Sequence, residues 1–213
     1  MKHDEIFQKE YGSCFFLSTI SAMLLRNPKV FEKSLLISEN SVTAKFYKPS
    51  RWLCFIKAKE YSVTLDKTLD LKKSAQPQWA GLFEKCYAQY VGGTSLYERG
   101  GYPWVVFLDL TGKMAKLAYT INDGFKKEII DACNSNNAIV ADSMSEDIIN
   151  KNPGSNIVPR HSYTVISAND ENITLRNPWG YFEPGIDGKN DGIFSISWGD
   201  FKKYFIRVSY CKI

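Results

Sequence analysis

The segment Ser13-Cys-Phe-Phe-Leu-Ser-Thr-Ile-Ser-Ala-Met-Leu-Leu25 is the most informative part of this sequence. Its apolar residues recur at the spacing of one helical face, Ser13 is a favourable N-cap, and the pair Asn27-Pro28 ends the pattern. We therefore predict a buried core helix with Cys14 at its first position. A cysteine at the mouth of a helix is unusual enough to guide the search for a functional site.

The same segment is not expected to address the chain to a membrane. Asp4, Glu5 and Glu10 replace the basic leader that a secretory signal peptide requires, and the apolar run is too short and too polar to cross a bilayer. We expect a soluble, cytoplasmic protein.

Composition agrees with a packed globule. Of 213 residues, 44% are hydrophobic and 14% aromatic, which argues against disorder. The 27 basic and 23 acidic residues are spread along the chain, so we expect neither nucleic acid nor a membrane as partner. Five cysteines without a Cys-x-x-Cys pair disfavour a disulfide framework and a zinc site, and favour a reducing compartment.

Hydrophobic periodicity predicts the other elements. A second helix begins at Gln78 and ends at Gly92-Gly93, and a third covers about 123–134, after an irregular stretch punctuated by Gly100, Gly101, Pro103 and Gly112. Strands are expected within 42–65, including 52–56, and at 138–141, 161–168, 172–176, 192–197 and 206–212, with a surface loop over 143–160. The helix-rich part is thus 1–122 and the strand-rich part 123–213.

Cys14 is the candidate nucleophile. Unpaired N–H groups and the helix dipole favour negative charge at a helix start, so we expect a lowered thiol pKa there. Cys54, Cys86, Cys133 and Cys211 are interpreted as structural cysteines, the commoner role for this residue type.

His161 is the candidate base, because the only other histidine, His3, lies in a polar N-terminal tail. A lone strand histidine is usually structural, so its neighbours matter. The Asn177 carboxamide could fix the imidazole tautomer, and Trp179 could shield that hydrogen bond from water. Gln8 could join the Cys14 N–H in an oxyanion hole. Taken alone, the Asn177 segment is equally typical of a turn followed by a core indole.

Together these residues resemble a known family. The order Cys14, His161, Asn177, with His161 147 residues after Cys14, is similar to papain-like proteases, in which the separation is about 130–150 residues. The segment Gln8-Lys-Glu-Tyr-Gly-Ser-Cys-Phe-Phe-Leu17 resembles the nucleophile motif of calpains, with the glutamine-to-cysteine distance kept.

Further calpain-like motifs follow in order to the C-terminus. They are Trp79 to Ala88, Gly92-Gly93, Asp109 to Gly112, His161 to Val165, Arg176-Asn-Pro-Trp-Gly180 and Asp191 to Phe201. The sequence departs from the family at Phe15, where tryptophan is usual, and at Ser13, where aspartate is usual. Neither change removes a catalytic group.

The resemblance implies an α+β, papain-like fold of two subdomains that form one catalytic unit, with the active site between them. It implies a cysteine endopeptidase that cleaves protein or peptide substrates through a thioester. Two alternatives stay open: an inactive module that binds a peptide in the same cleft, and a Cys-His deamidase or acyltransferase.

Calpain cores also bind calcium, and the resemblance implies Glu5, Glu183 and Asp191 as ligands. Two acidic ligands are replaced, one within Trp104 to Leu108 and one at Ile193. Calcium affinity depends steeply on ligand charge. We therefore expect no cofactor, and any calcium site to be weak or dispensable.

Overall fold

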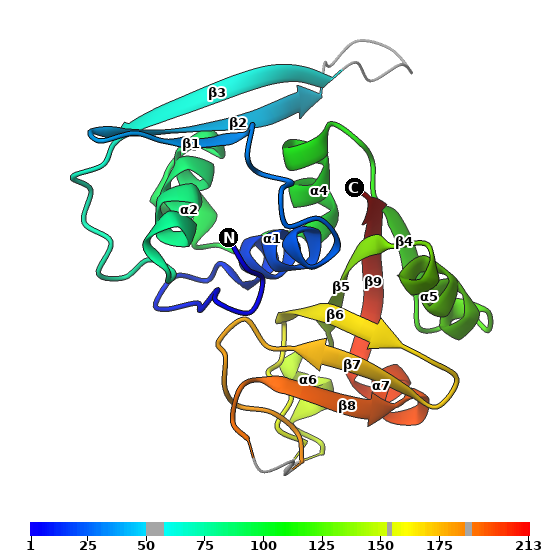
Figure 1. Ribbon diagram of the computed structural model, residues 1–213. Helices are drawn as coiled ribbons and strands as arrows, with labels where there is room; N and C mark the ends of the chain where they lie inside the picture. Colours follow the sequence, from blue (N-terminus) through cyan, green and yellow to red (C-terminus); the bar gives the residue numbers. More distant parts are fainter. Residues whose placement is uncertain (50–57, 153–154, 186–188) are drawn as a thin grey trace.

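A computed structural model describes residues 1–49, 58–152, 155–185 and 189–213. The first sheet is antiparallel, with strand order β1-β2-β3, and lies at one end of the molecule (Figure 1). Its strands are β1 (Leu35–Ile37), β2 (Ser41–Pro49) and β3 (Ala58–Asp66). The helices that accompany it are α1 (Cys14–Arg26), α2 (Gln78–Tyr90), α3 (Thr94–Tyr97) and α4 (Pro103–Thr111).

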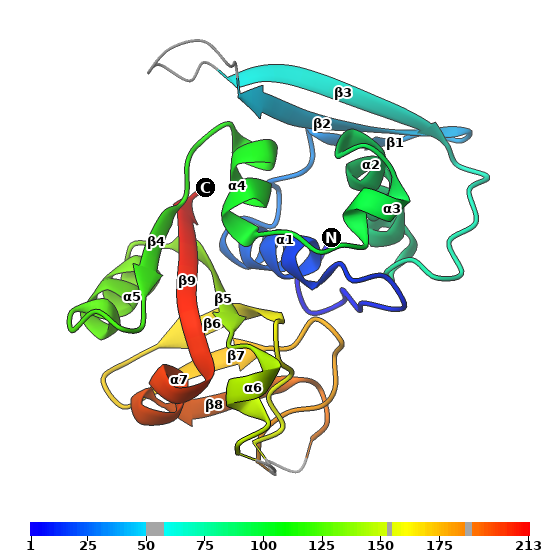
Figure 2. The same ribbon diagram turned by 180° about the vertical axis from the view of Figure 1, so that it is seen from behind.

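The second sheet has the strand order β4-β9-β5-β6-β7-β8, and all its pairings are antiparallel. Its strands are β4 (Lys116–Tyr119), β5 (Asn137–Ser143), β6 (Ser162–Ala168), β7 (Asn172–Arg176), β8 (Ile193–Ser197) and β9 (Phe205–Lys212). The helices α5 (Phe125–Asn134), α6 (Glu146–Ile149) and α7 (Trp198–Tyr204) belong to this half, as the view from behind shows (Figure 2). The fold therefore combines helices with antiparallel sheets, as predicted.

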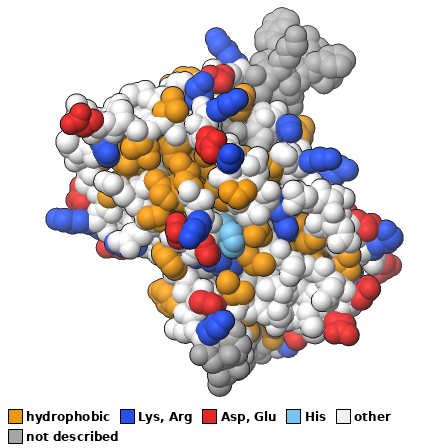
Figure 3. Space-filling model, in the orientation of Figure 1, with side chains coloured by type: hydrophobic (Ala, Val, Ile, Leu, Met, Phe, Trp, Pro, Cys, Tyr) orange, Lys and Arg blue, Asp and Glu red, His pale blue; other side chains and the backbone are white. Residues whose placement is uncertain are grey.

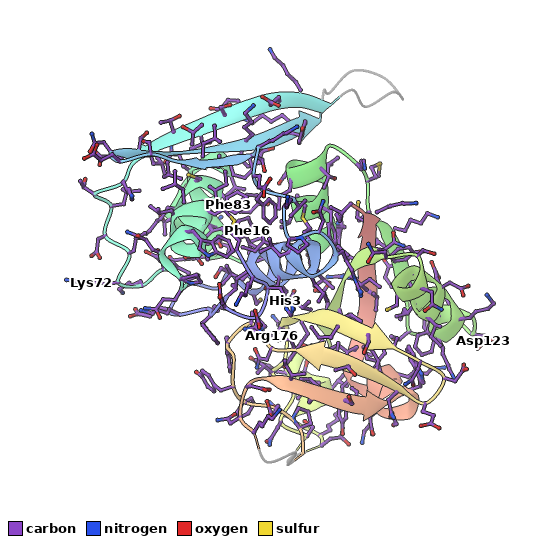
Figure 4. The ribbon with its side chains drawn as sticks, viewed as in Figure 1. His3, Phe16, Lys72, Phe83, Asp123 and Arg176 are labelled. Carbon is purple, nitrogen blue, oxygen red and sulfur yellow. The ribbon has the colours of Figure 1, made fainter. Side chains whose placement is uncertain are left out.

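The core of the first half forms around aromatic side chains of α1 and α2. Phe16 stacks on Tyr87 with ring centroids 4.5 Å apart and meets Phe83 edge-on at 5.3 Å. Figure 4 labels Phe16 and Phe83 between the two helices. Fully burying one such ring stabilises the fold by about 1.5–3 kcal/mol.

Helix α1 also packs on β5 and β6, so it joins the two halves. The Ser18 hydroxyl donates to the Ser162 carbonyl at 2.7 Å, and the Thr164 hydroxyl donates to the Ser18 carbonyl at 3.0 Å. Both bonds are buried, where an unpaired polar group would be costly. Cys14 and the start of β6 are thereby held in a fixed relation.

Most predicted elements are confirmed. Helix α1 ends before Asn27, α2 covers 78–90, and strands occupy the predicted positions in the C-terminal half. The predicted strand segment 52–56 lies outside the described residues. None of the helices in the described ranges is long and apolar enough to span a membrane.

Three expectations were wrong in detail. The stretch after Gly101 forms α4, because Pro103 occupies the first turn of the helix, where its missing N–H is not needed, and Gly112 ends the helix in a left-handed conformation with φ 69°. The predicted loop over 143–160 contains the short helix α6. Ser13 stands at the N-cap position of α1 without capping it, because its hydroxyl donates back to the Tyr11 carbonyl at 3.3 Å.

The change from one sheet to the other falls earlier than the division predicted at residue 122. Strand β4 precedes that point, yet it pairs with β9 in the six-stranded sheet. The sequence between Gly112 and Gly124 carries no composition change that would reveal this pairing.

Candidate active site

A cleft of about 1140 Å³ lies between the two halves and contains the residues of interest. One wall is formed by Gln8, Tyr11, Cys14, Phe15 and the segment Gly100 to Tyr102. The other wall is formed by Asp142, Ser143, His161, Ser162, Trp179 and Arg207. The structure thus brings Cys14, His161, Gln8 and Trp179 to one cleft, although they come from widely separated parts of the sequence.

The buried His161 side chain is oriented by Asn177. His161 Nε2 and Asn177 Oδ1 are 3.0 Å apart, and Asn177 Nδ2 donates to the Phe182 carbonyl at 3.0 Å. A carbonyl can only accept, so the amide orientation is fixed and Oδ1 faces the imidazole. His161 Nε2 must then carry the hydrogen. Nδ1 is left with the lone pair, as a base that receives the thiol proton requires.

Asn177 is itself held by the turn that follows β7. Its N–H donates to the Gly192 carbonyl at 2.8 Å, and its Oδ1 also accepts from the Trp179 N–H at 3.1 Å. The Trp179 ring lies against His161, with ring centroids 5.0 Å apart. The turn thus places the Trp179 indole against the imidazole that Asn177 contacts.

Desolvation opposes the charged form of both candidate catalytic groups. Desolvation raises the pKa of the Cys14 thiol to about 11, against the hydrogen bonds from Ser162 that favour the thiolate. Burial likewise lowers the pKa of His161 to about 4, and the hydrogen bond to Asn177 opposes this only in part. The direction of this shift is opposite to the lowering expected for a thiol at a helix start, and desolvation is its largest cause.

Gln8 lines the same cleft, and its position is set by backbone contacts. The Gln8 N–H donates to the Pro178 carbonyl at 2.8 Å, next to Asn177 in the sequence. Its Nε2 donates to the Tyr11 carbonyl at 2.7 Å, which uses one of its two hydrogens. The second hydrogen makes no hydrogen bond to the described residues, and the Cys14 N–H has no acceptor within its helix.

The N-terminal segment that carries Gln8 is anchored by Arg176. Its Nη2 donates to the carbonyls of Asp4 and Ile6, at 3.0 and 2.8 Å. Figure 4 labels Arg176 close to His3, below α1. The buried guanidinium therefore holds the chain that leads to Gln8 against the end of β7.

The residues suggested for calcium do not assemble into a site. Glu5 is exposed and pairs with Lys2 at 3.5 Å, and the exposed Asp191 accepts from the Ile193 N–H at 3.0 Å. Glu183 is buried, and its carbonyl accepts from Asn156 at 3.3 Å. In the part of the chain that the structure describes, no three His, Cys, Asp or Glu side chains are grouped to hold a metal ion.

Sequence reasoning missed Asp142, Ser162 and Arg207. Asp142 accepts from the Ser162 hydroxyl at 2.7 Å and from Arg207 Nε at 2.8 Å. Its charge raises the pKa of Cys14, so it acts on the candidate nucleophile. The available signal was an acidic residue directly after the apolar run 138–141.

Comparison with known proteins identifies the family of the chain. The sequence pattern of the calpain family of cysteine proteases matches residues 1–185, and the chain belongs to this family. It is 23% identical to calpain-9 of Mus musculus, over 98% of this chain and 36% of the relative. It is 24% identical to calpain-8 of Mus musculus, over 98% of this chain and 35% of the relative. The chain therefore spans about a third of the length of these relatives.

Proposed function

We propose that this chain is a cysteine endopeptidase that cleaves polypeptides in the cleft between two papain-like subdomains. Residues 1–122 would supply Cys14 and Gln8, and residues 123–213 would supply His161 and Asn177. The observation that carries the proposal is the fixed Asn177 amide, because it leaves His161 Nδ1 free to accept a proton in a cleft that also contains Cys14.

The reaction would begin with proton transfer from the Cys14 thiol to His161 Nδ1. Since desolvation opposes both the thiolate and the imidazolium, His161 would act as a general base while the sulfur attacks the peptide carbonyl. The Cys14 N–H and Gln8 Nε2 would donate to the oxyanion. His161 would then protonate the leaving amine, and water activated by His161 would hydrolyse the thioester.

A second candidate is a peptide-binding module without turnover. Desolvation raises the pKa of the Cys14 thiol and lowers that of His161, which opposes formation of the thiolate and favours this second function. The cleft would then bind a polypeptide through the same walls. Membership of the calpain family supports a protein substrate or ligand in either case.

Cleavage of an unfolded protein distinguishes these functions. Casein is incubated with the wild-type chain, Cys14→Ala and the matched control Cys133→Ala, and the products are identified by mass spectrometry. We expect peptide fragments with wild type and Cys133→Ala, and at least about a thousandfold less with Cys14→Ala. Binding without fragments would favour the module, and deamidated or acylated casein would favour a different transfer reaction.

A further inference from the structure

Three polar side chains form a row across the second sheet beside the candidate nucleophile. Asp142 lies directly opposite Arg207 on β9 and directly opposite Ser162 on β6. Residues directly opposite each other on neighbouring strands point to the same face of a sheet. All three side chains line the cleft, next to Cys14. The row is therefore a polar part of the cleft wall.

Within the row, both oxygens of the Asp142 carboxylate accept hydrogen bonds, whereas the Arg207 guanidinium donates from only one of its three nitrogens. Asp142 Oδ1 accepts from Ser162, and Asp142 Oδ2 accepts from Arg207 Nε. Both oxygens are thus engaged, and the Asp142 side chain is only 9% exposed. Arg207 Nη1 and Nη2 make no hydrogen bond to any residue within the described ranges. What the row offers to a ligand is therefore a set of N–H donors.

The Arg207 guanidinium is held in place from the opposite wall. It lies 4.3 Å from the ring centroid of Trp104 and 5.0 Å from that of Tyr102. These two rings stack on each other at 4.2 Å. Stacking and the Asp142 bond restrict the guanidinium plane before any ligand arrives, which lowers the entropic cost of binding. A planar fork of N–H donors matches the geometry of a carboxylate.

The rest of the cleft has the charge that such a ligand requires. Lys9, Arg99 and Arg160 line it and form no ion pair with the described residues. Three acidic residues line the cleft: Glu10 is paired with Lys73 at 3.0 Å, Asp142 is paired with Arg207, and the exposed Glu98 forms no ion pair with the described residues. Positive side chains are therefore in excess by one, with Lys9, Arg99, Arg160 and Arg207 against these three acids. Arg160, directly before His161, has a φ of 49°, a backbone conformation that favours glycine and costs free energy for other residues.

We propose that Arg207 is a specificity-determining residue that binds the side-chain carboxylate of a polypeptide segment in the cleft. The chain would accordingly prefer acidic segments with glutamate or aspartate close to the bond placed at Cys14. This inference deepens the proposed function and rests on it for the identity of the cleft. Its test does not require turnover.

The test measures peptide binding to the Cys14→Ala chain, which cannot consume its ligand by the proposed route. A peptide library is selected on this variant, and the best sequence is made as a matched pair that differs only by Glu or Gln. We expect the Glu peptide to bind at least about tenfold more tightly, which corresponds to about 1.4 kcal/mol. Equal affinities, or tighter binding of the Gln peptide, would overturn the proposal.

Two further variants assign the preference to Arg207. Asp142→Asn/Arg207→Met removes both charges without leaving a buried carboxylate unpaired, and Arg207→Lys keeps the charge but loses the fork. We expect the Glu-to-Gln affinity ratio to fall to about one in the first and to an intermediate value in the second. If circular dichroism shows the double variant to be unfolded, Arg207→Lys decides.

The control Lys116→Met removes one positive charge on β4, outside the cleft lining, and should keep the wild-type ratio. A Glu-to-Gln affinity ratio that stays at the wild-type value in both Arg207 variants would contradict the assignment of the preference to Arg207. An equal fall of this ratio in Lys116→Met would contradict it as well. Casein cleavage by the wild-type chain is scored separately. Absence of casein cleavage would thus refute the protease proposal without affecting the binding preference. Equal affinities for the Glu and Gln peptides would refute the binding preference without affecting the protease proposal.

Discussion

The Ser18 hydroxyl donates a buried hydrogen bond of 2.7 Å to the carbonyl of Ser162, the residue that follows His161. Ser18 lies one turn after Cys14 on α1, so this bond joins the helix of the candidate nucleophile to the strand of the candidate base. Ser162 also bonds to Asp142, which faces Arg207. The relative position of sulfur and imidazole therefore depends on contacts between helix and sheet.

Ser18→Ala should loosen this connection. The Ser162 carbonyl would be left buried without its side-chain donor, so we expect a loss of about 1–3 kcal/mol in the free energy of unfolding and a lower kcat. Urea denaturation and peptide turnover measure the two effects. Thr174→Ala, which removes an exposed hydroxyl paired with Ser195, is the matched control and should change neither by much. Equal behaviour of the two variants would contradict the positioning role.

Asn177→Ala should reduce turnover without abolishing it. The imidazole would lose the acceptor that fixes the hydrogen on Nε2, and water could replace it only in part. We expect kcat to fall by about two orders of magnitude. Steady-state kinetics on a peptide substrate test this, with His161→Ala as the more damaging comparison. Unchanged kcat would show that the tautomer is set by another contact.

Gln8→Ala should lower kcat by about 100- to 1000-fold, the usual cost of losing one oxyanion donor. KM should change little, because the oxyanion forms only in the transition state. The measurement is the separate determination of kcat and KM, with Gln89→Ala, at an exposed position of α2, as the control. A change confined to KM would assign Gln8 to substrate binding instead.

The buried His161 should make stability depend on pH. Its pKa is lowered from 6.5 to about 4 in the folded protein. Between these values the unfolded chain binds a proton that the folded protein does not, so stability is lost as pH falls from 6.5 toward 4. The loss from this group is at most about 3 kcal/mol. Urea denaturation at several pH values measures it, and His161→Gln should remove this part of the slope. An identical slope in both proteins would mean that His161 titrates normally.

Casein cleavage should persist in excess EGTA. The described residues gather no group of acidic side chains suited to calcium, and Glu5 is already paired with Lys2. Activity is measured across a calcium titration starting from chelator. Activity that vanishes in EGTA and returns with micromolar to millimolar calcium would restore a calcium requirement.

How far the sequence predicts this molecule depends on the kind of signal. Helix α2 could be bounded at Gln78 and Tyr90 because its apolar residues lie on one face and glycines follow. Helix α4 could not, because its sequence is apolar on nearly every side and its limits are set by Pro103 and Gly112, which resemble breakers. Proline in the first turn and glycine after the last turn are themselves helix-end signals, but the prediction interpreted both residues as punctuation of an irregular stretch.

The residues of the candidate site also differ in how clearly the sequence reveals them. Cys14, His161 and Asn177 belong to short motifs and could be named from the sequence. The pairing of Asp142 with Arg207 depends on the register of β5 against β9, over 65 residues apart in the chain, and no local pattern contains it. The raised pKa of Cys14 could not be predicted from the sequence, because desolvation depends on the tertiary surroundings of the thiol.

The most direct test of the central claim is to find the acyl-enzyme. The wild-type chain is mixed with a peptide ester, quenched in acid within the first turnover, and examined by intact-mass spectrometry and peptide mapping. A thioester on the peptide that contains Cys14, absent from Cys14→Ala and present in Cys133→Ala, is the predicted result. Substrate cleavage without an acyl group on Cys14, or with the group on another cysteine, would contradict the proposed mechanism.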